Sequence, residues 1–173
     1  MLFWLTELSD GGDFYNLFRY ITFRAGGAFM TALIFGFVFG PPLINVLRRS
    51  QGKGQPIRSD GPTSHFAKAG TPTMGGLLIV GALLTSTLLW ARLDNPYVWM
   101  VLFVMLSFGL IGFADDYAKV AKQNSNGVSG KIRLLLGLLV AGIAAVCAAT
   151  YHPEGLQNQL ALPVFKNTLI NLG

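Results

Sequence analysis

Charged side chains are absent from four long stretches of this 173-residue chain, and these stretches predict its helices. Each holds 20 to 23 residues without Asp, Glu, Lys or Arg: 25–47, 69–91, 95–114 and 134–153. About 20 apolar residues at a rise of 1.5 Å cross the roughly 30 Å hydrocarbon core of a bilayer. We therefore predict four transmembrane helices, at about residues 25–47, 74–91, 97–114 and 132–151.

The composition supports a membrane protein. Hydrophobic residues make up 52% of the chain and charged residues only 12%, with a mean hydropathy of +0.51. Soluble domains carry about a quarter charged residues. A soluble bundle of buried helices is the alternative, but such helices rarely run this long without a charge. We expect an all-α polytopic membrane protein with a single membrane domain over residues 1–173.

The polar segments predict an orientation. Two loops, at about 48–73 and 115–131, separate the predicted helices on one side of the membrane. Nine Lys and Arg residues, the last of them Arg133, lie on that side of the membrane, and four lie on the other side. Basic residues in short loops mark the cytoplasmic face. Both loops are therefore expected to be cytoplasmic and the N-terminus to lie outside.

Local signals refine the expected helices. Residues 1–24 are rich in aromatic side chains of the kind that sit at headgroup depth. Pro41 and Pro42 are expected to kink or end the first helix. The short segment 92–96 is expected to join the second and third helices as an antiparallel hairpin.

Two adjacent carboxylates, Asp115 and Asp116, stand at the end of the third predicted helix. Adjacent helical positions differ by about 100°, so one carboxylate can face a metal or substrate while the other faces a protein partner. The alternative is a solvated helix end, although carboxylates there oppose the helix macrodipole. Acids for a metal and bases for phosphates, at a membrane surface, indicate phosphate chemistry on a lipid.

Basic residues follow the acid pair. Lys119 lies four residues after Asp115 and can share its helical face. Lys131 lies at the start of the fourth predicted helix, two residues before Arg133. All three also fit the ordinary positive charge of a cytoplasmic loop.

The first loop ends in an unusual turn, Gly70-Thr-Pro-Thr-Met-Gly-Gly76, two residues after Lys68. Glycines permit a ligand to approach the backbone, and free amides at a helix start bind anions. The segment fits a phosphate-binding turn or an ordinary helix start capped by Thr71 or Thr73. The residues alone leave both readings open.

Three segments together resemble one enzyme family: Ser59-Asp-Gly-Pro-Thr-Ser-His65, Lys68-Ala-Gly-Thr-Pro-Thr-Met-Gly-Gly76 and Gly112-Phe-Ala-Asp-Asp-Tyr-Ala-Lys119. They look like the phospho-N-acetylmuramoyl-pentapeptide transferases, or translocase I, of the superfamily that transfers sugar phosphates to polyprenyl phosphate. That family's chains are longer, with more helices, a later magnesium-binding aspartate and a histidine-rich motif. The resemblance therefore implies that this chain is an N-terminal portion.

The resemblance implies a reaction in the bacterial cytoplasmic membrane, at the first membrane step of peptidoglycan synthesis. Phospho-N-acetylmuramoyl-pentapeptide passes from its UDP carrier to undecaprenyl phosphate, UMP is released, and Mg²⁺ is the required cofactor. The implied partners are these two substrates and the bilayer, with no nucleic acid beyond the uridine nucleotide. Glycine-rich helix faces also make a homodimer an expectation.

The resemblance also assigns residues by position. Asp115 and Asp116 would be the catalytic acid pair and candidate magnesium ligands, with Asp115 removing the proton of the lipid phosphate or orienting it. Lys68 and Thr73 would lie in the nucleotide and phosphate region, and two further lysines would contact phosphates: Lys119 and Lys131. Direct attack of the lipid phosphate on the pyrophosphate is the preferred mechanism, and a covalent aspartyl-phosphate is the alternative.

Three other functions compete with this one. Another polyprenyl-phosphate sugar-phosphate transferase would share the acid pair. A transporter or channel would need charged residues inside its helices, and the four charge-free stretches contain no Asp, Glu, Lys or Arg. A structural fragment without activity of its own is the third.

Overall fold

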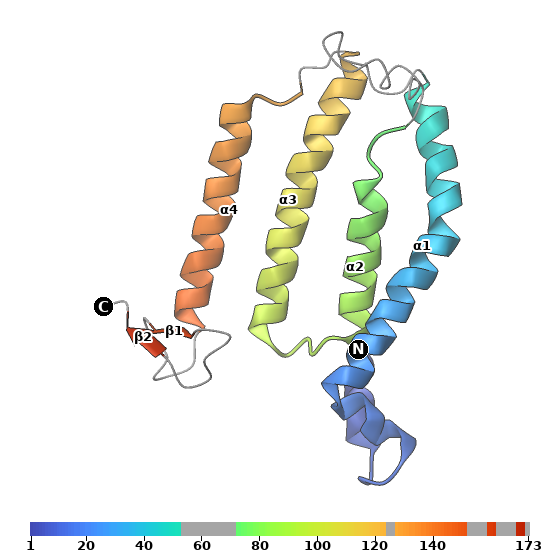
Figure 1. Cartoon of the computed structure of the whole chain (residues 1–173), viewed down its shortest axis with the longest axis vertical. Helices are drawn as coiled ribbons and strands as arrows, with labels where there is room; N and C mark the ends of the chain where they lie inside the picture. Colours follow the sequence, from blue (N-terminus) through green and yellow to red (C-terminus); the bar gives the residue numbers. More distant parts are fainter. Residues whose placement is uncertain (53–71, 124–126, 152–158, 162–168, 172–173) are drawn as a thin grey trace.

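The computed structural model describes residues 1–52, 72–123, 127–151, 159–161 and 169–171. Most of them form the helices α1 (Ile21–Gln51), α2 (Gly76–Trp90), α3 (Pro96–Ala121) and α4 (Gly130–Thr150). The helices stand in a row in chain order, with α1 against α2, α2 against α3 and α3 against α4 (Figure 1). The expected all-α, multi-span membrane architecture is confirmed.

Three of these helices are long and apolar enough to cross a bilayer: α1, α3 and α4. The fourth, α2, is apolar but has 15 residues, about 22 Å of helix against roughly 30 Å of hydrocarbon. The predicted span 74–91 is thus helical only from Gly76 to Trp90. Pro72–Gly75 precedes it as non-helical chain, in keeping with the poor helix propensity of proline and glycine.

Helix α1 runs through Pro41 and Pro42 and ends at Gln51. Of the two expected effects of these prolines, a kink or an end of the helix, the second is wrong. Each proline lacks an N–H and removes one hydrogen bond to the carbonyl four residues earlier. Apolar helices absorb such losses through local adjustment and neighbouring groups, and the apolar residues that follow, through Leu47, resume the helix.

Helix α3 also exceeds its predicted span of 97–114 and continues to Ala121. Its N-terminus is stabilised by Pro96 in the first turn and by the Asn95 side chain, which accepts a hydrogen bond from the Tyr97 N–H at 3.0 Å. The end of the charge-free run is not the end of the helix. Asp115 and Asp116 therefore lie inside α3, and the segment 115–131 is part helix and part loop.

The predicted hairpin between α2 and α3 is present, with a turn stabilised by charge (Figure 1). The Arg92 guanidinium donates to an Asp94 carboxylate oxygen at 2.6 Å. This hydrogen bond lowers the pKa of Asp94 below its ordinary value. The turn lies at the end of the row opposite Asp115.

Trp90 anchors α2 against α1 at that same end. Its indole N–H donates to the Thr31 hydroxyl at 2.9 Å, and its ring stacks on Phe18 with centroids 5.9 Å apart. Gly27 makes this contact possible, because a Cβ at that position would overlap the indole ring. The α1–α2 packing therefore depends on a glycine paired with a tryptophan.

Short elements flank the helical row. Two 3₁₀ helices, η1 (Leu2–Leu8) and η2 (Phe14–Arg19), form the N-terminal segment. Beyond α4, β1 (Gln159–Ala161) and β2 (Leu169–Asn171) pair as an antiparallel ladder, a small strand pair that the hydrophobic pattern did not predict. Both features lie at the end of the row away from the acid pair (Figure 1).

Candidate active site

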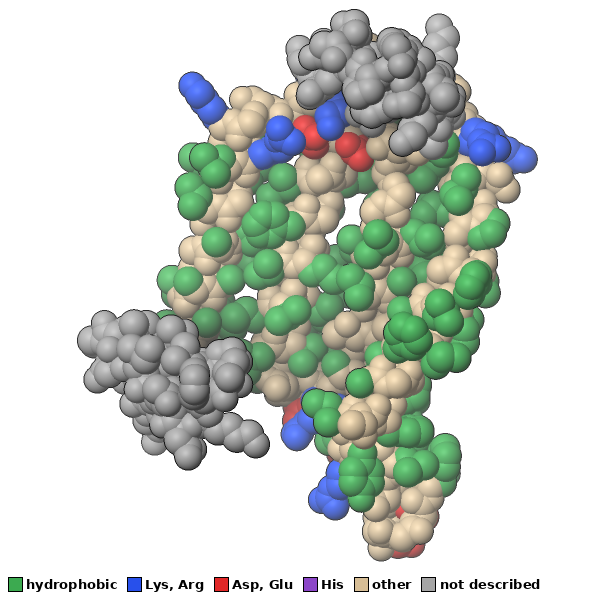
Figure 2. Space-filling model, viewed as in Figure 1, with side chains coloured by type: hydrophobic (Ala, Val, Ile, Leu, Met, Phe, Trp, Pro, Cys, Tyr) green, Lys and Arg blue, Asp and Glu red, His purple; other side chains and the backbone are tan. Residues whose placement is uncertain are grey.

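Acidic and basic side chains gather at one end of the row, where α3 and α4 carry them past the apolar surface (Figure 2). Asp115, Asp116 and Lys119 all lie on the last turns of α3. A spacing of four residues places Lys119 beside Asp115, whereas Asp116 is turned by about 100°. The two neighbouring carboxylates consequently have different surroundings.

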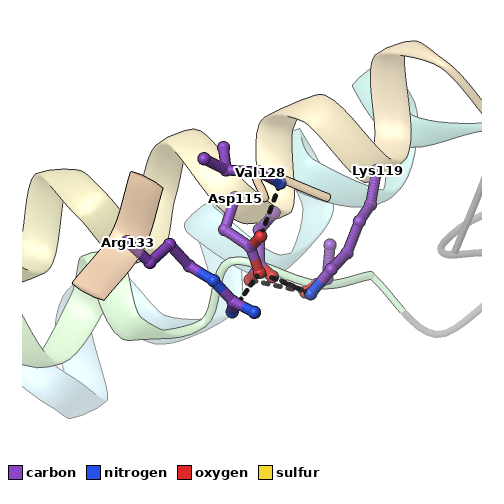
Figure 3. Close-up of polar contacts among 6 residues, drawn as sticks. Asp115, Lys119, Val128 and Arg133 are labelled. Atoms are coloured by element: carbon purple, nitrogen blue, oxygen red, sulfur yellow. Dashed lines mark hydrogen bonds and ion pairs between the residues drawn. The ribbon is translucent and has the colours of Figure 1, made fainter. Parts of the chain in front are cut away.

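Asp115 is a buried carboxylate, 6% exposed, that accepts from three donors (Figure 3). Lys119 Nζ lies 2.7 Å from Oδ2 and the Arg133 guanidinium 3.3 Å from the same oxygen. The Val128 backbone N–H donates to Oδ1 at 2.8 Å. These contacts favour the ionised carboxylate, fasten the start of α4 to α3, and leave Asp115 little capacity for another ligand.

Gly127 lets the loop before α4 close over Asp115. A Cβ at this position would overlap the Asp115 carboxylate and crowd the Lys119 side chain. The close approach of backbone to carboxylate therefore requires glycine.

Asp116 is the more accessible acid, with 31% of its side chain exposed. The Thr73 hydroxyl donates to its Oδ2 at 3.0 Å, and Lys119 Nζ lies 3.5 Å from its Oδ1. Among the described residues, Oδ1 has only this long contact, which is the longest made by any oxygen of the acid pair. Thr73 does not cap α2, whose N-cap is Gly75 without a side-chain hydrogen bond.

Thr73 is itself held by Gln51, the last residue of α1. The Gln51 amide oxygen accepts from the Thr73 N–H at 2.8 Å, and the Gln51 amide nitrogen donates to the Thr73 carbonyl at 3.0 Å. Gln51 is 6% exposed. Three segments distant in sequence thus meet at the acid pair: the end of α1, the turn before α2 and the end of α3.

A cavity of about 480 Å³ lies between α2 and α3 and reaches the acid pair. Both carboxylates line its polar end, and the rest of its wall is mainly apolar. The lining residues are Met74, Gly76, Leu77, Val80, Leu106, Phe108, Gly109, Leu110, Gly112, Phe113, Asp115 and Asp116.

The remaining predicted site residues are not brought into this cluster. Lys131 lies exposed in the first turn of α4, and none of the hydrogen bonds or ion pairs among the described residues includes it. Lys68 lies outside the described residues. The structure instead adds Gln51, Val128 and Arg133, of which only Arg133 gave a sequence signal, as a basic residue at the start of a helix.

The described residues contain no group of three or more His, Cys, Asp or Glu side chains arranged to hold a metal. Among the described residues, Asp115 has contacts on both oxygens, whereas Oδ1 of Asp116 has one contact, at 3.5 Å. Carboxylate oxygens are ligands that Mg²⁺ prefers. This part of the chain therefore fits Mg²⁺ through one or two carboxylates, with Asp116 the better placed.

Comparison with known proteins identifies close relatives. The pattern described as phospho-N-acetylmuramoyl-pentapeptide-transferase signature 1 matches residues 68–80, which include the Thr73 turn and the start of α2. Proteins bearing that enzyme name from Ruegeria pomeroyi, Ruegeria sp. TM1040 and Dinoroseobacter shibae are 80%, 78% and 69% identical over 173 residues. These alignments take in 99% or more of this chain. The chain spans 48% of the length of each relative.

Proposed function

We propose that this chain supplies the acid-pair part of the active site of a phospho-N-acetylmuramoyl-pentapeptide transferase, the enzyme name borne by the relatives that match its sequence. In the proposed reaction an oxygen of undecaprenyl phosphate attacks the sugar-bearing phosphorus of the UDP carrier. The new P–O bond forms as the bond to UMP breaks, and phospho-N-acetylmuramoyl-pentapeptide remains on the lipid. The proton of the lipid phosphate passes to a carboxylate.

One observation carries this proposal: carboxylates, basic side chains and the Thr73 turn converge at one end of apolar membrane helices. A lipid phosphate sits at the bilayer surface and a nucleotide arrives from water, so the two meet only at such an interface. Transfer between two anions is opposed by charge repulsion, and catalysis depends on positive groups and positioning. Lys119 and Arg133 supply that charge beside the acids.

The contacts favour different roles for Asp115 and Asp116. Asp115 accepts from three donors and holds Lys119 in place. Asp116, with an available Oδ1, is the better candidate to take the proton of the lipid phosphate or to orient it. The sequence analysis gave this role to Asp115. The tight ion pair of Asp115 also disfavours a covalent aspartyl-phosphate at that residue, which leaves direct attack as our proposal.

Mg²⁺ is the proposed cofactor, and when bound it neutralises charge on the transferring phosphate groups. Among the described residues, Asp116 Oδ1 is the oxygen best able to hold it, and Asp115 is the second candidate. Lys68 and Lys131 remain proposed phosphate contacts.

We further propose that the acid-pair end faces the cytoplasm of a bacterial inner membrane, with the N-terminus outside. The excess of basic residues at that end supports this orientation. A homodimer is also proposed, because α4 presents an apolar exposed face that includes Leu134, Leu138 and Val146 and Gly142 has open space before it.

Release of UMP by the full-length protein tests the function. With UDP-linked muramoyl-pentapeptide and undecaprenyl phosphate, we expect Asp116→Asn to lower turnover at least about a hundredfold, the scale of a lost general base or metal ligand. Asp94→Asn, an exposed acid at the opposite end, is the matched control and should leave turnover unchanged. Normal turnover by Asp116→Asn would refute the role. Transfer from other UDP-sugars, but not from this one, would point instead to a related transferase.

A further inference from the structure

The most developed contact outside the acid pair is the pairing of Gln51 with the backbone of Thr73. Both polar ends of one side-chain amide are used, at 2.8 and 3.0 Å, and the side chain is 6% exposed. The two residues are separated by 22 positions. This contact therefore joins the end of α1 to the turn before α2.

The pairing acts on a residue that touches a carboxylate. The Thr73 hydroxyl donates to Asp116 Oδ2 at 3.0 Å. With its N–H and its carbonyl both held by Gln51, Thr73 has its backbone fixed on either side of its Cα. The direction of its hydroxyl is then limited to rotation about one side-chain bond.

The backbone conformation of Met74, the next residue, requires contacts that stabilise the turn. Met74 has φ of +71°, in the left-handed region that a bulky side chain rarely occupies. Such conformations persist only where surrounding contacts determine them. The Gln51 pairing on one side and the Met74 carbonyl, which accepts from the Leu77 N–H at 3.1 Å, on the other supply those contacts.

We propose that Gln51 is a positioning residue for Asp116, acting through Thr73. It fixes the Thr73 backbone, Thr73 binds Oδ2 of Asp116, and Oδ1 is thereby directed towards substrate or metal. This inference rests on the proposed function, because it assigns Gln51 to the same reaction. Gln51 itself touches no reacting group.

Hydrogen exchange tests the contact without reference to activity. Gln51→Met preserves the approximate length of the side chain and removes both hydrogen bonds. In the full-length protein, we expect the Thr73 amide to exchange at least about tenfold faster in this variant, because a protected amide becomes open. Ser50→Ala, which removes only a local bond to the Leu47 carbonyl, is the control and should leave this amide protected. Unchanged exchange in Gln51→Met would overturn the inference.

A double-mutant cycle tests the route to Asp116. Gln51→Met should lower kcat by about tenfold to a hundredfold, the scale of a misplaced catalytic group, with KM nearly unchanged. Thr73→Val removes the hydroxyl that links Gln51 to Asp116. In the Thr73→Val background, Gln51→Met should lower kcat by less than about threefold, because the effects of coupled residues are non-additive. An equal loss in both backgrounds would mean that Gln51 does not act through the Thr73 hydroxyl and would overturn the proposal.

Two outcomes separate this inference from the proposed function. If Asp116→Asn retains full turnover, the proposed role of Asp116 fails whatever the exchange result is. If Asp116→Asn is inactive but Gln51→Met behaves like wild type in exchange and kinetics, the inference alone fails. Should Gln51→Met not fold, Gln51→Glu keeps the acceptor for the Thr73 N–H but loses the donor when ionised. We expect that variant to protect the Thr73 amide and still to lower kcat, and a normal kcat would contradict the proposal.

Discussion

Asp115 and Asp116 differ in what surrounds them. Asp115 is 6% exposed and bound by Lys119, Arg133 and the Val128 backbone, so it serves chiefly to join the end of α3 to the start of α4. Asp116 is bound by Thr73, and among the described residues its Oδ1 has one contact, at 3.5 Å. These contacts are the basis of the different roles that we propose for the two neighbours.

This division predicts different results for the two Asp→Asn variants. Asp115→Asn removes the negative partner of Lys119 and should destabilise the protein by about 1–3 kcal/mol, the cost of leaving a partly buried polar group unsatisfied. Asp116→Asn should leave stability unchanged while activity falls. Thermal unfolding in detergent measures both. Equal melting temperatures for Asp115→Asn and wild type would contradict the structural role of Asp115.

At this scale the sequence predicted the acids and Lys119 but not their partners. An acid pair after an apolar run, with a lysine four residues later, is visible in the chain. Gln51 and Thr73 are 22 residues apart, and their pairing depends on how α1 packs beside the turn before α2. No local pattern encodes such a contact. The same limit applies to the role of proton acceptor, which the sequence gave to Asp115 and which the contacts lead us to propose for Asp116.

The absence of charge along the sequence predicted where the helices lie, but it did not predict the residues at which they begin and end. Charge-free runs report the length of chain suited to hydrocarbon, whereas a helix ends where its backbone hydrogen bonds end. Helix α3 continues to Ala121 because charged residues are compatible with helix outside the apolar layer. Helix α2 begins only at Gly76 because the preceding turn is held by Gln51 and Asp116.

Packing between elements predicts a contrast between two adjacent glycines of α1. Gly27→Ala places a methyl group in the Trp90 ring and should destabilise the protein by about 1–3 kcal/mol, as overpacking does. Gly26→Ala meets open space and should be neutral or stabilising by up to about 1 kcal/mol, because alanine favours helix. Detergent melting curves compare the two. Similar losses for both variants would contradict the close α1–α2 contact at Gly27.

On the scale of the whole molecule, the helices form a row one helix thick (Figure 1). Few side chains are buried, and apolar residues such as Phe37, Val101 and Leu138 are well exposed. This surface suits lipid or further helices, and the chain spans 48% of the length of its relatives. Because all charged site residues lie at one end of the row, the proposed chemistry requires that end to face the compartment that holds the nucleotide.

Cysteine accessibility in the full-length protein, in a Cys147→Ala background, tests this requirement most directly. Ser129→Cys reports on the acid-pair end and Asp10→Cys on the opposite end, and both positions are exposed. In intact cells, a maleimide that passes the outer membrane but not the inner membrane should label position 10. It should label position 129 only after the inner membrane has been permeabilised. Labelling of position 129 from outside would place the acid pair away from the cytoplasmic nucleotide and contradict the account.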